Sequence, residues 1–223
     1  MPSHDMINDR NTKLADSITT MLGQTELTRF AVGYFFVSGL ESIAKRLSHV
    51  KELKLLIGTT TNSRTVEQMA EGHCRLSLVH EELEEDNYRK KSDKQAMAAA
   101  TAENVRSAIE LMDQTDIAEE TVHVLVRMID EKRLKVRVYT KGRMHAKTYI
   151  FTYGDTFNLL GQPIEKHEKD VAVVGSSNLS LAGILHNTEL NVVVSGNNNH
   201  DELCSWFDAL WDESQDFDES HHG

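Results

Sequence analysis

Apolar residues along this chain are spaced in two ways, and each spacing predicts one kind of element. Dense apolar, β-branched and aromatic runs that end at glycine or polar residues are typical of buried strands. Such runs cover residues 29–37, 53–57, 134–139, 144–151, 171–174 and 189–194. Apolar residues at helical spacing predict an N-terminal helix over 5–22 that Gly23 ends, a short helix through Ile43 and Leu47, and a last helix over 200–211.

The order of these elements predicts the fold class. The first two strands and the short helix between them form a β-α-β unit, whose crossover implies parallel neighbouring strands. Residues 63–132 are rich in Ala, Glu, Met, Gln and Leu, and the segments 96–112 and 117–129 predict helices that bury the sheet. We therefore expect an α/β fold over residues 1–211, a mixed sheet flanked by helices, with this helical stretch inserted before the later strands.

Length and composition limit the number of domains and the cellular location that we expect for the protein. The 223 residues, 39% of them hydrophobic, suit one globular domain, and a second domain is not required. No window has the length and apolarity of a membrane span, and the first ten residues lack the order of a signal peptide. These features predict a cytoplasmic protein without a membrane partner. The acidic segment 212–223 is expected to be a disordered tail.

The net charge of −11 argues against a protein that coats nucleic acid by bulk attraction. Its distribution is uneven, because residues 132–147 carry seven basic side chains and no acidic one. This run is either a solvated strand edge or a surface that binds phosphate. The candidates for contact with nucleic acid are Lys135, Arg137, Lys141 and Arg143.

The basic run leads into a His-x-Lys pair, His145 and Lys147. Side chains alternate across a strand, so the two should share one face, about 7 Å apart, where both could reach a single phosphate. Alone the pair is a weak signal, since His167 and Lys169 form another in a polar stretch that a solvated turn explains.

Further polar residues follow at strand ends. Ser176 and Asn178 stand two apart after the apolar run 171–174, and Glu189 opens the next strand. With these residues the chain resembles the phospholipase D superfamily, whose signature runs His-x-Lys, a spaced Asp and Gly-Ser-x-Asn, followed by an acidic residue. The segment 33–39 also resembles the opening of such domains. The resemblance extends to the N-terminal phospholipase D-like domains of helicase-like or restriction-system proteins.

The chain departs from the signature at one position. The Asp of the family stands five residues after the Lys, where this chain has Thr152. A polar insertion, expected to be a hairpin or loop, separates 151 from 171 and contains Asp155 and Asp170, neither at the matching position. The departure bears on catalytic competence more than on fold.

The resemblance implies a phosphodiesterase that needs no metal or other cofactor. The imidazole of His145 would attack phosphorus and form a phosphohistidine. Lys147 and Asn178, with the hydroxyl of Ser176, would hold the phosphate oxygens, and Glu189 would fix the imidazole tautomer.

A second histidine must protonate the leaving oxygen, and this chain has one complete motif. In the family, single-motif chains pair as twofold dimers, so the resemblance implies a homodimer with His145 of each copy at a shared site. His186 is an internal alternative, but no second set of Lys and Asn accompanies it.

Three hypotheses follow for function. The first is a metal-independent nuclease that acts on nucleic acid, with DNA as the expected substrate. The basic run favours nucleic acid over a lipid because contact with successive phosphates needs such charge. The second is a non-catalytic DNA-binding or dimerisation module of a larger helicase-like protein, which Thr152 and the overall acidity favour. The third is an α/β protein in which the motif matches are accidental.

Overall fold

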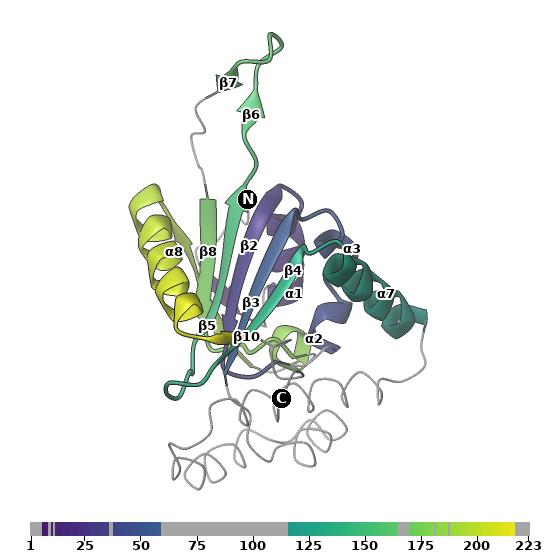
Figure 1. Ribbon diagram of the computed structural model, residues 1–223, viewed down its shortest axis with the longest axis vertical. Coiled ribbons are helices and arrows are strands. Elements are labelled where there is room, and N and C mark those ends of the chain that lie inside the picture. The colour runs from purple at the N-terminus through teal and green to yellow at the C-terminus, as the bar shows by residue number, and fades with distance from the viewer. Residues whose placement is uncertain are drawn as a thin grey trace, which may run out of the picture.

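A computed structural model describes residues 6–8, 10, 12–35, 38–58, 116–164, 170–180, 182–186 and 188–216. These residues form an α/β fold around one eight-stranded mixed sheet, with strand order β1-β9-β8-β5-β2-β3-β4-β10 (Figure 1). The predicted fold class is therefore confirmed. The strands of the sheet are β1 (Met6–Asn8), β2 (Thr25–Val32), β3 (Glu52–Gly58), β4 (Leu134–Tyr139), β5 (Lys147–Tyr153), β8 (Asp170–Gly175), β9 (Leu190–Ser195) and β10 (Gln215–Asp216).

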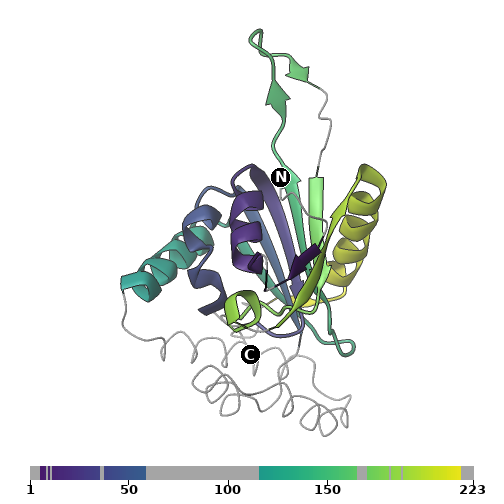
Figure 2. The ribbon, with the colours of Figure 1, turned by 180° about the vertical axis from the view of Figure 1, so that it is seen from behind.

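Helices cover both faces of this sheet (Figures 1 and 2). One face is packed by α1 (Leu14–Leu22), α2 (Ser38–Glu41), α3 (Ala44–Leu47), α7 (Asp116–Asp130) and the single π-helical turn η2 (Ala182–His186). The other face is packed by α8 (Asn197–Asp212) alone among the described helices. None of the described helices is long and apolar enough to cross a membrane.

The dense apolar runs form strands because successive side chains are buried on opposite faces. In β2, Phe30 and Val32 belong to the core under α1, while Ala31 between them packs under α8. The face under α8 uses small side chains, Ala31 and Ala172, beside the rings of Phe207 and Trp211. Small residues on the sheet let this helix approach closely enough to seat its aromatic side chains.

The parallel arrangement predicted for the β-α-β unit is confirmed, because β2, β3 and β4 run parallel. β5 is antiparallel to β2, and β8 is antiparallel to β5. β8 therefore runs parallel to β2. The helix predicted over 117–129 is α7, whereas the segment 96–112 lies outside the described residues.

Several predicted boundaries differ from the structure, among them the start of β5, which lies at Lys147 and not at residue 144. Residues 6–8 are not helical but form β1, because the backbone edge of β9 is available for pairing there. The strand predicted over 29–37 starts at Thr25 and ends at Val32. The segment predicted as a disordered tail from residue 212 is ordered up to residue 216. Here α8 continues to Asp212, and β10 pairs with β4. Residues 217–223 lie outside the described residues.

The insertion after β5 contains a hairpin, as predicted. Its strands are β6 (Thr156–Phe157) and β7 (Pro163–Ile164), and Asn158 organises the turn by accepting hydrogen bonds from the backbone N–H groups of Leu160 and Gln162, both at 2.9 Å. Figure 1 shows this hairpin standing away from the domain, beyond the end of β5.

A substitution in α8 tests how much this helix holds the fold together. Phe207 is fully buried and its neighbour Trp206 is 37% exposed. We expect Phe207→Ala to lower the free energy of unfolding in urea by about 3 to 5 kcal/mol, because it leaves a cavity against the sheet. The control Trp206→Ala should cost less than about 1 kcal/mol. Equal losses for the two variants would contradict this account of the packing.

Candidate active site

The residues predicted for catalysis lie at one edge of the sheet, which we call the site edge. Ser176 and Asn178 follow the carboxyl end of β8, while His145 and Glu189 precede β5 and β9. Since β8 runs antiparallel to both β5 and β9, its end meets their beginnings. The carboxyl ends of β2, β3 and β4 reach the same edge. Ligand sites in α/β sheets are typically found outside the carboxyl ends of strands.

Two glycines let backbone segments meet under His145. The N–H of Gly33 donates to the carbonyl of Ala146 at 2.8 Å. A Cβ added to Gly33 would lie 2.9 Å from the carbonyl oxygen of Met144, and one added to Gly58 would lie 2.6 Å from that of Gly33. No side chain fits at either position, so the main chain before β5 is held against the ends of β2 and β3. The same contact explains why β2 ends at Val32.

The geometry predicted for the His-x-Lys pair was wrong in one respect. β5 begins at Lys147, so His145 precedes the strand and does not alternate with Lys147 along it. His145 is exposed, whereas Lys147 is only 6% exposed and its Nζ donates to the carbonyl oxygen of His145 at 3.1 Å. The ring of Tyr34 meets the imidazole edge to face, with centroids 6.5 Å apart. A largely buried cation therefore lies against the main chain of an exposed histidine.

Asn178 connects the turn after β8 to the end of β2. Its Oδ1 accepts a hydrogen bond from the backbone N–H of Tyr34 at 3.3 Å. Because that contact assigns the oxygen of the amide as acceptor, the amide NH₂ is the end that can donate to an anion. The predicted role of Asn178, a donor to a phosphate oxygen, is compatible with this orientation.

Ser176 and Glu189 form a second contact at the site edge. The hydroxyl of Ser176 donates to the Glu189 carboxylate and accepts from the N–H of Leu190 at 3.1 Å. The carboxylate that the sequence assigned to the imidazole of His145 is thus bound to Ser176, and its contact with His145 stays a prediction.

Sequence reasoning missed two polar residues under this edge. Tyr149 is fully buried and donates to the carbonyl of Ser177 at 2.8 Å, and its pKa is raised well above the usual range by burial and then by the charge of Glu189. The buried amide of Asn191 donates to Ser177 Oγ at 2.9 Å. Both support the turn that carries Ser176 and Asn178. A signal for Asn191 was present, since it is a polar residue inside an otherwise apolar strand.

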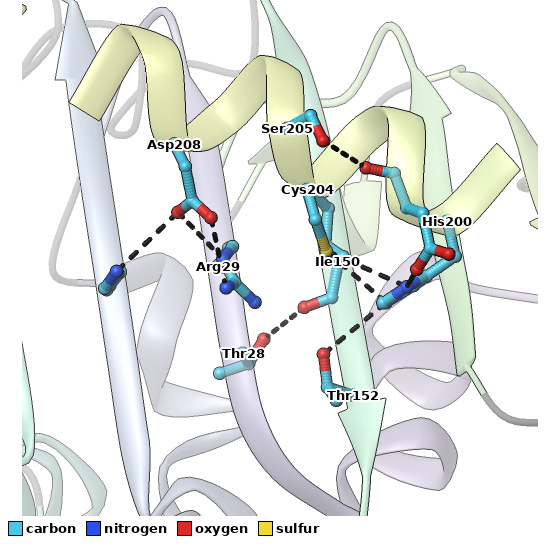
Figure 3. A network of polar contacts seen from close by, with 10 residues as sticks. Thr28, Arg29, Ile150, Thr152, His200, Cys204, Ser205 and Asp208 are labelled. Carbon is cyan, nitrogen blue, oxygen red and sulfur yellow. Dashed lines mark hydrogen bonds and ion pairs between the residues drawn. The ribbon is translucent and has the colours of Figure 1, made fainter. Parts of the chain in front are cut away.

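Thr152, the residue that stands where the predicted signature has Asp, lies at the other end of β5. It is five residues from Lys147, or about 17 Å along the strand. Its Oγ1 lies 3.4 Å from Nε2 of His200, a residue of α8 that faces the sheet (Figure 3). At that distance position 152 cannot contact a phosphate bound at His145, so it acts on the site only through the fold.

A carboxylate does lie beside Thr152, but a neighbouring strand supplies it. Asp170 of β8 pairs directly with Thr152. Its Oδ1 accepts from the N–H of Tyr153 at 2.7 Å, and its Oδ2 lies 3.7 Å from Nδ1 of His200. The other candidate, Asp155, is exposed before the hairpin.

The four predicted nucleic-acid contacts fall into two pairs. Lys135 is bound to Glu52, and the guanidinium of Arg137 donates to the carbonyl of Trp211 at 2.9 Å above the indole ring. Lys141 and Arg143 are exposed in the turn between β4 and β5 at the site edge, where Lys141 lies 3.4 Å from Glu213.

Two alternatives from the sequence, a second His-x-Lys pair and an internal partner histidine, fall outside what the structure describes. The pair His167 and Lys169 lies outside the described residues, and so does the side chain of His186. Within the described ranges no three His, Cys, Asp or Glu side chains are grouped to hold a metal ion.

Comparisons with solved structures agree with this fold. Phosphatidylserine synthase from Haemophilus influenzae Rd KW20 matches with a TM-score of 0.50 at 12% identity, over 96% of this chain and 39% of that one. NucT from Helicobacter pylori matches with 0.46 at 12% identity, over 95% and 96% of the chains. Nuc from Salmonella typhimurium, a phospholipase D family member, matches with 0.44 at 12% identity, over 90% and 88%. At these identities the likeness concerns the fold alone.

No curated protein matches the sequence. A family model does: the one described as "Cardiolipin synthase, PLD-like domain" matches residues 68–211, well over half of the chain. These matched residues include His145, Lys147, Ser176, Asn178 and Glu189. The chain belongs to the PLD-like domain family.

Proposed function

We propose that this protein is a metal-independent phosphodiesterase that cleaves nucleic acid, DNA in particular, at a site shared by two copies of the chain. The observation that carries the proposal is the meeting of His145, Lys147, Ser176, Asn178 and Glu189 at one edge of the sheet. Membership of a family of phosphodiester-processing enzymes supports the same reaction class.

The first step is attack by a neutral nitrogen of His145 on phosphorus. A P–N bond forms, the bond from phosphorus to the leaving oxygen breaks, and that oxygen takes a proton from His145 of the partner subunit. In the second step the partner's His145 takes a proton from water, the water oxygen attacks phosphorus, and the P–N bond breaks. The products are one end that carries a phosphomonoester and one end that carries a free hydroxyl, and both histidines return to their first state.

Lys147 supplies the positive charge that this chemistry needs. Its ammonium is nearly buried beside the main chain of His145, so water screens it less than it screens a surface cation. Negative charge grows on the non-bridging oxygens in the transition state, and a fixed cation with the amide of Asn178 stabilises it. The carboxylate of Glu189 accepts a hydrogen bond from the Ser176 hydroxyl and keeps that hydroxyl oriented.

The exposed cations Lys141 and Arg143 favour a nucleic-acid substrate. They precede His145 along the chain and lie at the site edge, where a polyanion could contact them while one phosphate reaches the imidazole. Lys135, Arg137 and Lys141 each contact another group of the chain, namely Glu52, the carbonyl of Trp211 and Glu213. We therefore rank the four predicted contacts by position, and Lys141 and Arg143 come first because they lie in the turn next to His145.

A non-catalytic DNA-binding module, within a larger helicase-like protein, is the alternative. Its motive is Thr152 in place of the family Asp. That position lies about 17 Å from Lys147 along β5, which weakens the case against turnover.

Removing the nucleophile separates these two functions. We expect wild-type protein to cleave single- or double-stranded DNA in the presence of EDTA, and His145→Ala to lose at least about a thousandfold in rate while still binding DNA. The control His49→Ala changes an exposed histidine in the turn after α3 and should be as active as wild type. Binding without turnover by wild-type protein across DNA, RNA and phospholipid substrates would support the module.

Mixed dimers test whether the site is shared. When wild-type and His145→Ala chains are refolded together in equal amounts, only about a quarter of the dimers carry two intact copies. Activity per wild-type chain should then fall to about half, because a mixed dimer lacks one histidine. Unchanged activity per wild-type chain would mean that each chain acts alone.

The two exposed cations have a separate signature in the salt dependence of binding. Lys141→Ala/Arg143→Ala removes two positive charges at the site edge, so the slope of log affinity for DNA against log salt should become less steep by up to about 2. Lys45→Ala/Arg46→Ala removes the same charge from α3 and should leave the slope unchanged. Equal slopes for both variants would place the DNA elsewhere.

A further inference from the structure

An exposed apolar cluster lies next to the candidate active site. Met6, Leu190 and Val192, which we call the β9 patch, are 59%, 55% and 42% exposed. Val192 pairs directly with Met6 across β9 and β1, and Leu190 pairs with Asn8. Paired residues of an antiparallel ladder point to the same face, so the three apolar side chains form one surface.

The course of α8 leaves this surface uncovered. The side chain of Asn191, between Leu190 and Val192, is buried on the opposite face against Ser177, so the patch is on the α8 side of the sheet. Figure 1 shows α8 starting at the end of the sheet near the hairpin and running towards β10. Val194, near the start of the helix, packs with the α8 cluster, whereas Leu190 at the site edge does not. Large exposed apolar patches typically mark interaction surfaces.

The patch adjoins the residues of the half-site directly. Leu190 follows Glu189 in the chain, and its N–H donates to the hydroxyl of Ser176. A protein that packs on the patch would therefore lie beside the Ser176–Glu189 contact. If that protein is a second copy related by a twofold axis, each half-site is brought next to the other.

The chemistry of the patch suits a second copy of this chain. In a twofold interface each patch contacts the same patch of its partner, so a charged surface would oppose itself. The chain carries a net charge of −11, which makes self-contact unfavourable over much of its surface. The β9 patch is apolar, and its paired neighbour Asn8 is neutral. It can meet its own copy without burying like charges.

A second exposed apolar cluster makes a useful comparison. The hairpin exposes Phe157, Leu159, Leu160 and Ile164, and its turn residue Leu159 is fully exposed. The hairpin extends from the end of β5 opposite the site edge (Figure 1). Copies joined through it would hold their two half-sites apart, so this cluster cannot serve a shared site.

We propose that the β9 patch is the surface through which a second copy of this chain docks and completes the active site. This inference rests on the proposed function, because the patch needs to face a second copy only if each chain carries half of a shared site. The proposed reaction requires a second copy but does not say which surface binds it, and the inference names that surface.

Val192→Glu tests the surface and leaves the predicted catalytic residues in place. We expect the dissociation constant of the dimer, measured by sedimentation, to rise at least about a hundredfold, because a charge must be buried against its own copy. Cleavage of DNA in EDTA should fall at low protein concentration and return as the concentration is raised. Leu159→Glu/Leu160→Glu on the hairpin should dimerise and cleave as wild type does.

Three other outcomes would overturn the proposed interface, and the last of them would also overturn the shared site. If Val192→Glu dimerises and cleaves like wild type, the interface lies elsewhere and the shared site still stands. If it lowers the melting temperature of dilute monomeric protein without changing association, a segment of the same chain covers the patch. If wild-type protein is active and monomeric at every concentration, the shared site of the proposed function is wrong as well.

Discussion

The contact of three backbone segments at the site edge is the constraint on which the site depends. Gly33, Gly58 and the carbonyl of Met144 approach so closely that a Cβ at either glycine would overlap main-chain atoms. This contact lies where β2 ends, and it holds the segment before β5 in place. His145 in that segment is exposed, whereas Lys147, two residues later, is the first residue of β5. A histidine on a loop would otherwise have many orientations, and a fixed main chain removes most of them.

The sheet is asymmetric around this edge. Under α1 the strands present aromatic side chains such as Phe30, Tyr149 and Phe151, while under α8 they present Ala31 and Ala172 beside Leu56 and Ile150. Tyr149 extends this core as far as the turn after β8 through its hydrogen bond to Ser177. The core thus supports the site from one face, while the diagonal course of α8 leaves part of the other face open.

Charge is distributed to suit an acidic chain that handles phosphate. Acidic side chains bind several of the cations remote from the site, as Glu52 does with Lys135 and Asp208 does with Arg29. Lys147 is instead placed against a carbonyl and kept from water. Asp170 of β8 pairs with Thr152 of β5 and has His200 as its neighbour, so a neighbouring strand brings a carboxylate to this end of β5.

The sequence by itself determined the fold class and most strands, and it supplied the hypothesis of the half-site, because dense apolar runs and motif spacing are local properties of the chain. The strand predicted over 134–139 is β4 to the residue. Only the tertiary structure decided three contacts. Residues 6–8 pair with β9, Arg137 donates a hydrogen bond to the carbonyl of Trp211, and Glu189 accepts one from Ser176. Each of these depends on which distant segments become neighbours. Backbone edges, cations and carboxylates can pair with many partners, and the packing of the whole chain selects among them.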